Sequence, residues 1–267
     1  MFVLGIIASC GMGLILSLLG AGGSILTLPI LVYLFSISVV EATSYSLLLV
    51  GITAALSFIV YLKQNLVNLR VGIIFGIPSI IGVVLARKVL VPYLPDTFNF
   101  LNLSISKSFI IMATFSILML VSATLMIRDR KLNLTEPKKQ KAEFEKNIII
   151  ILEGLIVGQL TGFVGAGGGF LIIPALVLLT GLEMRVAVGT SLFIIAIKSL
   201  AGFGSDVIDG FQADWMFSIF VILATFVGVI FGNMLSKKIT DKTLKKYFGY
   251  MTLFIGSFII IEQLINL

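Results

Sequence analysis

The sequence contains no histidine and a single cysteine, Cys10, among its 267 residues. Without histidine, a histidine-based zinc site, a Ser-His-Asp triad and a histidine proton relay are all excluded. A lone cysteine excludes an intramolecular disulfide and a multi-cysteine metal site. The chain is therefore not expected to be an enzyme, and neither a cofactor nor a metal is expected.

Charged residues are also scarce, at 12% of the chain, while hydrophobic residues reach 58%. A soluble domain has about 25% charged and about 45–50% apolar residues, so much of this apolar surface needs lipid as its solvent. The net charge of +6 could suggest a nucleic-acid partner. The basic residues, however, stand in short segments between apolar runs, which is typical of membrane orientation. The sequence thus predicts a lipid-embedded protein with no nucleic-acid partner.

Apolar stretches follow one another along the whole chain. A membrane-spanning helix needs roughly 17–25 mainly apolar residues. Six stretches have about this length: 42–62, 70–87, 107–127, 186–204, 213–235 and 247–265. Two more, 2–36 and 147–181, are too long for one span, and each contains a glycine run near its middle. Each of them predicts either two short helices that meet at a glycine turn or one span with a re-entrant piece.

Lysine and arginine gather in the linker 128–146, with seven residues, and in the loop 236–246, with five. Short basic loops normally stay on the cytoplasmic side, which requires an even number of crossings between these two. The stretch 147–181 must then cross twice or not at all, which favours a helical hairpin or a re-entrant pair. With hairpins in both halves, both termini and Arg87 lie on the outer side. The prediction is an all-α polytopic transmembrane protein of about 8–10 spanning or re-entrant helices.

The two halves of the chain resemble each other at a fixed offset of 145 residues. Residues 19–35, LGAGGSILTLPILVYLF, align with residues 164–180, VGAGGGFLIIPALVLLT, and share the Gly-Ala-Gly-Gly sequence and a proline. An odd number of crossings per copy makes the copies antiparallel, which is the inverted-repeat plan of many secondary transporters. The expected organisation is a first transmembrane repeat at 1–127, a basic cytoplasmic linker at 128–146 and a second transmembrane repeat at 147–267.

In each copy an apolar helix runs into Gly-Ala-Gly-Gly, and a second helix follows. A helix N-terminus at membrane depth presents free N–H groups and a partial positive charge, which suits an anion. Close helix packing explains these glycines equally well, and it is the preferred explanation for Gly154, Gly158 and Gly162. A nucleotide is not expected, because no Lys-Ser or Lys-Thr follows the glycines. The candidate substrate-binding residues of the turns are Gly20, Gly22, Gly23, Ser24, Gly165, Gly167, Gly168 and Gly169.

Small hydroxyl side chains open the helix after each turn, and one lysine lies inside a span. Serine and threonine can cap helix starts, and they can also donate to oxyanions. The hydroxyl candidates for substrate binding are Thr43, Ser44, Ser46, Thr190 and Ser191. Lys198 lies within 186–204, where a charge is costly and suggests a function. It could bind the anion, pair with Asp206 or Asp209, or extend its ammonium group to the membrane surface.

The second glycine turn and the segment after it resemble the signature of one family. Phe163 to Gly169, then Pro174, then Ala187-Val188-Gly189-Thr190-Ser191 are similar to the TauE/SafE sulfite exporter family, also called the 4-toluene sulfonate uptake permease family. The first copy departs from that signature, with Ser24 in place of the third glycine and Ala42-Thr43-Ser44-Tyr45-Ser46 in place of Ala-Val-Gly-Thr-Ser. The resemblance implies a bacterial-type inner-membrane transporter of sulfur-containing anions such as sulfite or sulfonates.

The sequence and the resemblance together predict a secondary transporter, expected to be an exporter, that moves a small anion by alternating access between two repeats. An anion channel and a transporter of an unrelated small metabolite are the alternatives. The expected partners are the small anion and membrane lipid. A coupling ion and a homo-oligomer are left open.

Overall fold

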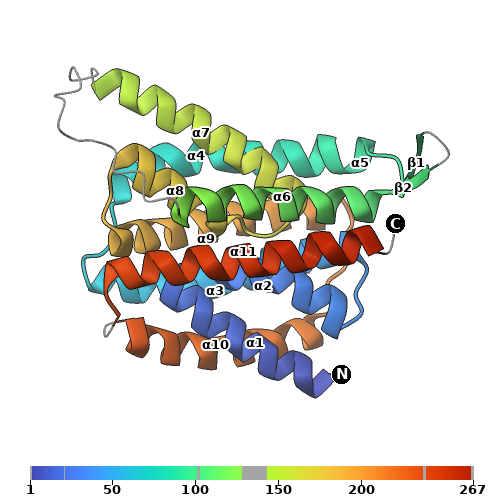
Figure 1. Ribbon diagram of the computed structural model, residues 1–267, viewed down its shortest axis with the longest axis horizontal. Coiled ribbons are helices and arrows are strands. Elements are labelled where there is room, and N and C mark those ends of the chain that lie inside the picture. The colour runs from blue at the N-terminus through green and yellow to red at the C-terminus, as the bar shows by residue number, and fades with distance from the viewer. Residues whose placement is uncertain (1, 21, 101–102, 128–142, 237–238, 266–267) are drawn as a thin grey trace.

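The computed structural model describes residues 2–20, 22–100, 103–127, 143–236 and 239–265 of the chain. Most of the expected basic linker lies outside these residues, as do Ala21 and residues 237–238. The described residues form one bundle whose helices run roughly along a common direction (Figure 1).

The elements of the first half are α1 (Phe2–Leu19), α2 (Gly22–Pro29), η1 (Ile30–Leu34), α3 (Val39–Lys63), α4 (Leu69–Leu85), η2 (Ala86–Leu90), α5 (Val91–Tyr93), β1 (Thr97–Phe100), β2 (Leu103–Ser106) and α6 (Lys107–Ile127). Those of the second half are α7 (Glu143–Val164), α8 (Gly169–Ala175), η3 (Leu176–Thr180), α9 (Met184–Ile208), α10 (Trp215–Ser236) and α11 (Asp241–Ile265). The elements η1, η2 and η3 are π-helical turns. Strands β1 and β2 pair antiparallel in a short hairpin that the sequence did not predict. In the described part of the chain, seven helices are long and apolar enough to cross a membrane and three apolar helices are shorter, which confirms the all-α polytopic class.

Capping residues, rather than hydrophobicity, set several helix ends. The helix α3 begins before its predicted span because the Ser38 hydroxyl oxygen accepts a hydrogen bond from the backbone N–H of Glu41. The helix α4 follows Asn68, whose Oδ1 accepts from the backbone N–H of Val71 at 3.1 Å. The helix α11 begins at Asp241 in the charged loop, since lysine and other polar residues are good helix formers in water. The apolar run therefore marks the part of a helix that meets lipid, and the helix itself is longer.

The two long stretches form hairpins, as the glycine runs predict (Figure 1). In the first hairpin α1 leads to the turn at Gly20, and α2 with η1 returns. In the second, α7 leads to the turn at Gly165, and α8 with η3 returns. From Gly22 to Leu34 the returning arm covers about 20 Å, whereas the hydrocarbon core of a membrane is about 30 Å thick. These arms are too short to cross a membrane, which makes them the re-entrant pieces of the prediction.

Helix packing follows the 145-residue offset between the halves. The helix α1 packs along α10, and its counterpart α7 packs along α4, the counterpart of α10. At the centre α3 packs along its own counterpart α9, with Gly51 against Leu200 and Gly202 against Leu47. Two copies in an inverted arrangement require this reciprocal packing. The duplication itself stays a prediction from the sequence.

The predicted packing role of the glycines in α7 is confirmed. A Cβ on Gly154 would lie 2.5 Å from the carbonyl oxygen of Phe75, and one on Gly158 would lie 2.3 Å from that of Ser79. Both carbonyls belong to the backbone of α4, so the two helices touch main chain to main chain. Such close contact replaces the hydrophobic effect as the source of helix association in lipid.

Replacing Gly158 by alanine is expected to destabilise the protein by about 1–3 kcal/mol, because the added methyl must push two helix backbones apart. Gly11 in α1 is the matched control, since a Cβ there has no neighbour within 4 Å. Gly11→Ala should leave stability unchanged or raise it by up to about 1 kcal/mol. Thermal unfolding in detergent measures both variants, and equal midpoints would contradict the packing role.

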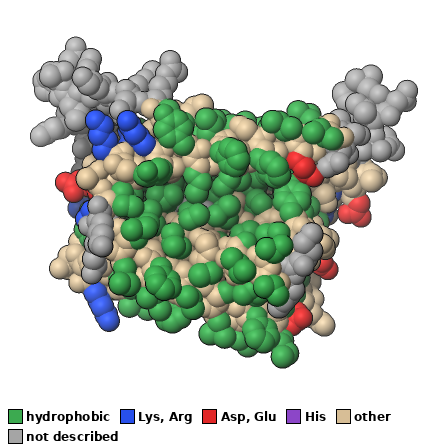
Figure 2. Space-filling view, turned by 60° about the horizontal axis from the view of Figure 1, so that its bottom comes forward, with side chains coloured by type: hydrophobic (Ala, Val, Ile, Leu, Met, Phe, Trp, Pro, Cys, Tyr) green, Lys and Arg blue, Asp and Glu red, His purple; other side chains and the backbone are tan. Residues whose placement is uncertain are grey.

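The surface separates into a hydrophobic band and two polar ends. Figure 2 shows hydrophobic side chains over the face between the ends, with lysine and arginine gathered at one end and most acidic side chains at the other. The helix α1 begins and α11 ends at the end that carries the β-hairpin (Figure 1). Because basic loops normally face the cytoplasm, the end with the β-hairpin is called the outer end below and the basic end the inner end.

Candidate functional site

Both turns are made by glycines with positive φ: Gly20 (+71°), Gly165 (+72°), Gly167 (+63°) and Gly168 (+71°). Residues with a Cβ rarely adopt this region. The first glycine of each turn also rests on a long helix. A Cβ on Gly20 would lie 3.0 Å from the Cα of Val188, and one on Gly165 would lie 2.6 Å from the Cα of Thr43. Thr43 and Val188 are 145 residues apart, so both turns are seated on equivalent positions.

The two turns rest toward opposite ends of the bundle. Thr43 lies near the outer start of α3, and Val188 lies near the inner start of α9. Gly167 packs against Val50, near the middle of α3. The predicted site residues therefore do not form one cluster but lie at three depths. The inner level has Gly20, Thr190 and Ser191, and the outer level has Thr43, Ser44 and Gly165. The central level between them has Ser24, Gly167, Gly168 and Lys198.

The central level joins the two hairpins to Lys198. A Cβ on Gly167 would lie 3.3 Å from the Cβ of Ser24, so the second turn reaches the start of α2. Lys198 is only 1% exposed, and its ammonium group donates a hydrogen bond to the hydroxyl of Thr161 on α7. A Cβ on Gly168 would lie 2.8 Å from the ammonium nitrogen. The backbone of the second turn thus lies directly beside a buried cation.

No carboxylate pairs with Lys198 among the described residues. Asp206 pairs with Arg87, and Asp209 lies 4.0 Å from Lys88. The predicted alternative that Lys198 pairs with one of these two acids is therefore wrong, and its burial shows that it does not extend to the surface either. A buried ammonium group costs several kcal/mol unless an opposite charge and hydrogen bonds compensate it. The site therefore holds a buried lysine that has no carboxylate partner among the described residues.

The other hydroxyl candidates are engaged to different degrees. The Ser46 hydroxyl is buried and has no hydrogen-bond partner within the described residues. The Ser191 hydroxyl donates to the carbonyl of Val188 at 2.7 Å. The Thr190 hydroxyl accepts from the backbone N–H of Asn68 at 2.9 Å and so supports the start of α4. Ser46 is thus the candidate whose polar group is left for a ligand.

The remaining glycine candidates have packing or boundary roles. A Cβ on Gly23 would lie 2.3 Å from the Cβ of Leu16, so Gly23 lets α2 approach α1. Gly22 and Gly169 are the first residues of α2 and α8. For Gly23 the packing explanation is the better one.

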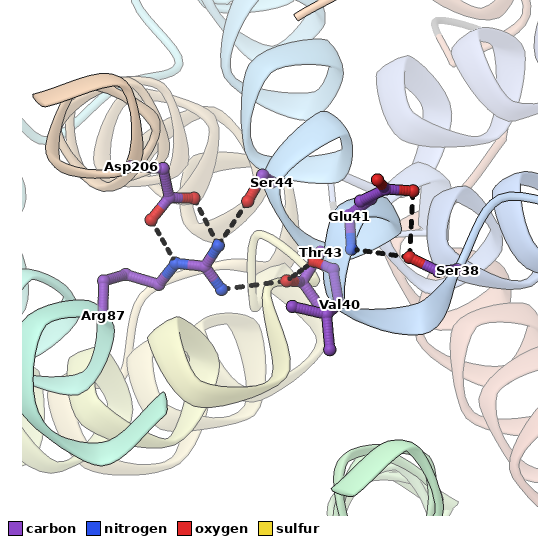
Figure 3. A network of polar contacts seen from close by, with 7 residues as sticks. All are labelled: Ser38, Val40, Glu41, Thr43, Ser44, Arg87 and Asp206. Carbon is purple, nitrogen blue, oxygen red and sulfur yellow. Dashed lines mark hydrogen bonds and ion pairs between the residues drawn. The ribbon is translucent and has the colours of Figure 1, made fainter. Parts of the chain in front are cut away.

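At the outer level Arg87 holds a buried polar network (Figure 3). Its Nε donates to Asp206 Oδ1 at 2.6 Å, and its Nη2 donates to the other carboxylate oxygen. Nη1 donates to the Thr43 hydroxyl at 2.9 Å, and Nη2 also donates to the Ser44 hydroxyl at 2.5 Å. One guanidinium therefore joins η2, the start of α3 and the end of α9.

A hollow of about 490 Å³ opens over this network. Its lining includes Ser44, Arg87, Lys88, Asp206, Asp209 and Phe211. It is large enough for a small hydrated anion, and the Arg87 network forms part of its wall.

The sequence predicted Arg87 to be one of the outer cations, and it offered Asp206 as a partner for Lys198 and as a weak proton-coupling candidate, but it did not predict that the two pair. Their positions in the sequence, relative to the predicted spans, could have predicted that the two residues pair. Arg87 ends the predicted span 70–87, and Asp206 follows the predicted span 186–204. With the two copies antiparallel to each other, the spans 70–87 and 186–204 run in the same direction. Their C-terminal ends therefore meet at the same face, where opposite charges attract each other.

Comparison with known proteins identifies the family of the chain. The sequence profile of a family described as "Sulfite exporter TauE/SafE" matches residues 5–259. The chain belongs to this family. It is 29% identical to "Probable membrane transporter protein YunE" of Bacillus subtilis, over 99% of this chain and 97% of the relative. It is 28% identical to "Probable membrane transporter protein MJ0441" of Methanocaldococcus jannaschii, over 90% and 86%. No solved structure matches the chain at a comparable level.

TauE/SafE membership confirms the resemblance that the sequence showed. Together with the seven apolar helices, it makes the chain a multi-pass membrane protein and indicates a membrane transporter rather than an enzyme. The two motifs of the resemblance occupy distinct places. The turn at Gly165–Gly169 lies beside Lys198, and the segment Ala187–Ser191 lies against Gly20.

Proposed function

We propose that this TauE/SafE protein is a secondary transporter that exports a small anion, sulfite or an organosulfonate, by alternating access between two inverted repeats. The observation that supports the proposal most directly is the buried Lys198 ammonium group, which lies beside the second glycine turn with no carboxylate partner among the described residues.

The magnitude of the interaction favours an anion. Placing a lysine at the centre of a membrane helix costs about 2.5–3.5 kcal/mol on insertion scales. An anion about 4 Å from the ammonium group returns about 4 kcal/mol at an effective dielectric constant of 20. A bound anion therefore offsets the cost of the buried charge, and the backbone of the second turn, which lies beside Lys198, can offer further donors.

Alternating access is supported by the arrangement around that cation. The second hairpin approaches Lys198 through Gly168 and Thr161, while the first hairpin approaches Gly167 through Ser24. Both re-entrant arms thus meet at the depth where secondary transporters with inverted repeats bind substrate. Motion of one hairpin against the other would change the end from which Lys198 is reached. Export and the sulfur-containing substrate come from the family's description, "Sulfite exporter TauE/SafE".

Purified protein in liposomes tests the proposal. Liposomes loaded with ³⁵S-sulfite under nitrogen should release it at a rate that saturates with concentration, and methanesulfonate should compete while a neutral sulfone should not. Saturation is expected because a carrier must close around each substrate. Release that rises linearly with concentration would identify an anion channel instead, and absence of flux with sulfite, sulfonates and carboxylates alike would reject anion transport.

A further inference from the structure

The Arg87 network has the geometry of an oxyanion site whose anion is a residue of the chain itself. A guanidinium binds two oxygens side by side through Nε and one Nη, which is the geometry of the Arg87–Asp206 pair. Two hydroxyls, of Thr43 and Ser44, accept from its other N–H groups. The whole network is buried, yet it forms part of the wall of the outer hollow.

The Asp206 carboxylate shares its chemistry with the proposed substrates. Sulfite, a sulfonate and a carboxylate each present two oxygens on one side of a small central group, and each can accept both N–H bonds of the fork. A spherical halide cannot span both donors in this way. An oxyanion in the hollow could therefore replace Asp206 on Arg87 and keep the guanidinium hydrogen-bonded throughout.

We propose that Arg87 and Asp206 form an outer gate that opens by anion exchange. This inference rests on the proposed function, because it takes the transported species to be an oxyanion. In the closed form, Asp206 occupies the guanidinium and ties the end of α9 to η2 and α3. When an oxyanion binds Arg87 from the hollow, Asp206 is released, α9 separates from η2, and the path toward Ser46 and the central level opens.

The aligned positions at the inner end carry no such pair. By the repeat offsets, with the one-residue shift that aligns Gly82-Val83 with Gly228-Val229, Arg87 corresponds to Asn233 and Asp206 to Tyr61. Both of these side chains are neutral, and the Tyr61 hydroxyl donates to the carbonyl of Ser17 at 2.9 Å. At these two aligned positions no carboxylate can be exchanged for an anion. The inner end has an ion pair of its own, between Arg185 Nε and Asp241 Oδ1 at 3.0 Å, but both side chains are more than a third exposed, whereas the Arg87–Asp206 pair is buried.

A purely structural ion pair would make a different prediction. Such a pair holds η2 against α9 and responds to no anion, and neutralising it only loosens the fold. A gate, in contrast, controls access from the outer side to residues below it, and it responds to oxyanions.

Cysteine accessibility distinguishes the two. In a Cys10→Ser, Ser46→Cys background the only thiol lies one helical turn inward from Thr43, at a position with 0% exposure. Labelling of intact spheroplasts with a membrane-impermeant, cationic methanethiosulfonate reports access from outside, because a cationic reagent cannot itself replace Asp206 on Arg87. Asp206→Asn should raise the labelling rate about tenfold, and Asp209→Asn should not change it. Asp209 is the matched control because it borders the same hollow, is about half exposed and lies 4.0 Å from Lys88.

Anion exchange has its own readout in Trp215, the single tryptophan of the chain. Its ring packs edge-on against Phe203, which packs against Phe211 in the wall of the hollow. In purified protein, methanesulfonate should change Trp215 fluorescence saturably, and chloride at the same ionic strength should not. The neutral double variant Arg87→Gln, Asp206→Asn should lose this response and label as fast as Asp206→Asn.

The outcomes separate the inference from the proposed function. Equal labelling of the Asp206→Asn and Asp209→Asn variants, or a methanesulfonate response that survives in the double variant, would overturn the gate. If Asp206→Asn alone does not fold, the labelling rate and the fluorescence response of the double variant still test the gate, because the double variant leaves no buried charge unpaired. Faster labelling of Asp206→Asn together with no flux of any anion would leave a gate in place and reject the transport function.

Discussion

Replacing Lys198 by methionine is expected to lower the kcat/KM of anion transport about 100- to 1,000-fold without lowering the stability of the protein. The loss follows from the attraction of about 4 kcal/mol that the ammonium group offers an anion at this depth. Methionine has a similar length and no charge, so it fills the same space. Because Lys198 is buried among apolar helices, removing its charge also removes an insertion cost of about 2.5–3.5 kcal/mol.

The test is specific to binding because the kcat/KM of transport should fall while the stability of the protein should not. A residue that only supports the fold would lose both together when it is replaced. Thr161 keeps an acceptor for its hydroxyl proton in the carbonyl of Gly158 at 3.3 Å, so the variant leaves no new unpaired donor. Lys63→Met, at the exposed end of α3, removes a lysine of the same kind and should leave the rate unchanged. Flux in liposomes and thermal unfolding of the same preparations test this prediction. Normal transport by the Lys198→Met protein would show that Lys198 does not bind the transported anion.

The hairpins could be predicted from the sequence because two physical signals agree there. Residues 2–36 and 147–181 are too long for one span, and glycine runs break both of them near the middle. The count of basic loops then fixed an even number of crossings. What the sequence could not predict is the depth of each turn, because that depends on which long helix supports it. Gly20 and Gly165 are equivalent in sequence but rest near opposite ends of the bundle.

The Arg87–Asp206 pair escaped prediction for a related reason. Each residue lies at the end of an apolar run, where a charged side chain normally meets water. Their burial comes from a third segment, the start of α3, whose Thr43 and Ser44 close over the guanidinium. Such a contact between three distant segments leaves no periodicity in any one of them.

The departure of the first copy from the family signature has a structural meaning. Tyr45 corresponds to Thr190, and the two hydroxyls accept from the backbone N–H groups of Asp214 and Asn68, each just before a long helix of the other half. The supporting bond is thus kept although the residue differs. Thr43 and Ser44, in contrast, correspond to Val188 and Gly189, which have no hydroxyl to offer. The same supporting bond thus occurs at aligned positions of the two halves, and a few side chains at neighbouring positions make the two ends different.

Replacing Gly165 by alanine is expected to abolish transport and to destabilise the protein by about 2–5 kcal/mol. Two costs add in this variant. A left-handed conformation at φ +72° costs an L-residue about 1–2 kcal/mol. The new Cβ would also lie 2.2 Å from the Cβ and 2.6 Å from the Cα of Thr43, and overpacking of this kind costs about 1–3 kcal/mol. Because a backbone atom cannot move aside as the end of a side chain can, the second turn must move away from α3 and lose its contact with Thr43.

Gly181→Ala separates these two costs, because Gly181 has nearly the same φ, +71°, and a Cβ there meets nothing within 4 Å. This control should lose only the backbone term of about 1–2 kcal/mol and should keep most of its transport activity. Thermal unfolding measures the difference between the two variants, and flux in liposomes shows whether the seat of the turn matters for transport. If Gly165→Ala transports as well as Gly181→Ala, the turn does not need its contact with α3. The second hairpin would then be a structural support, and the moving part of the transporter would have to be sought elsewhere.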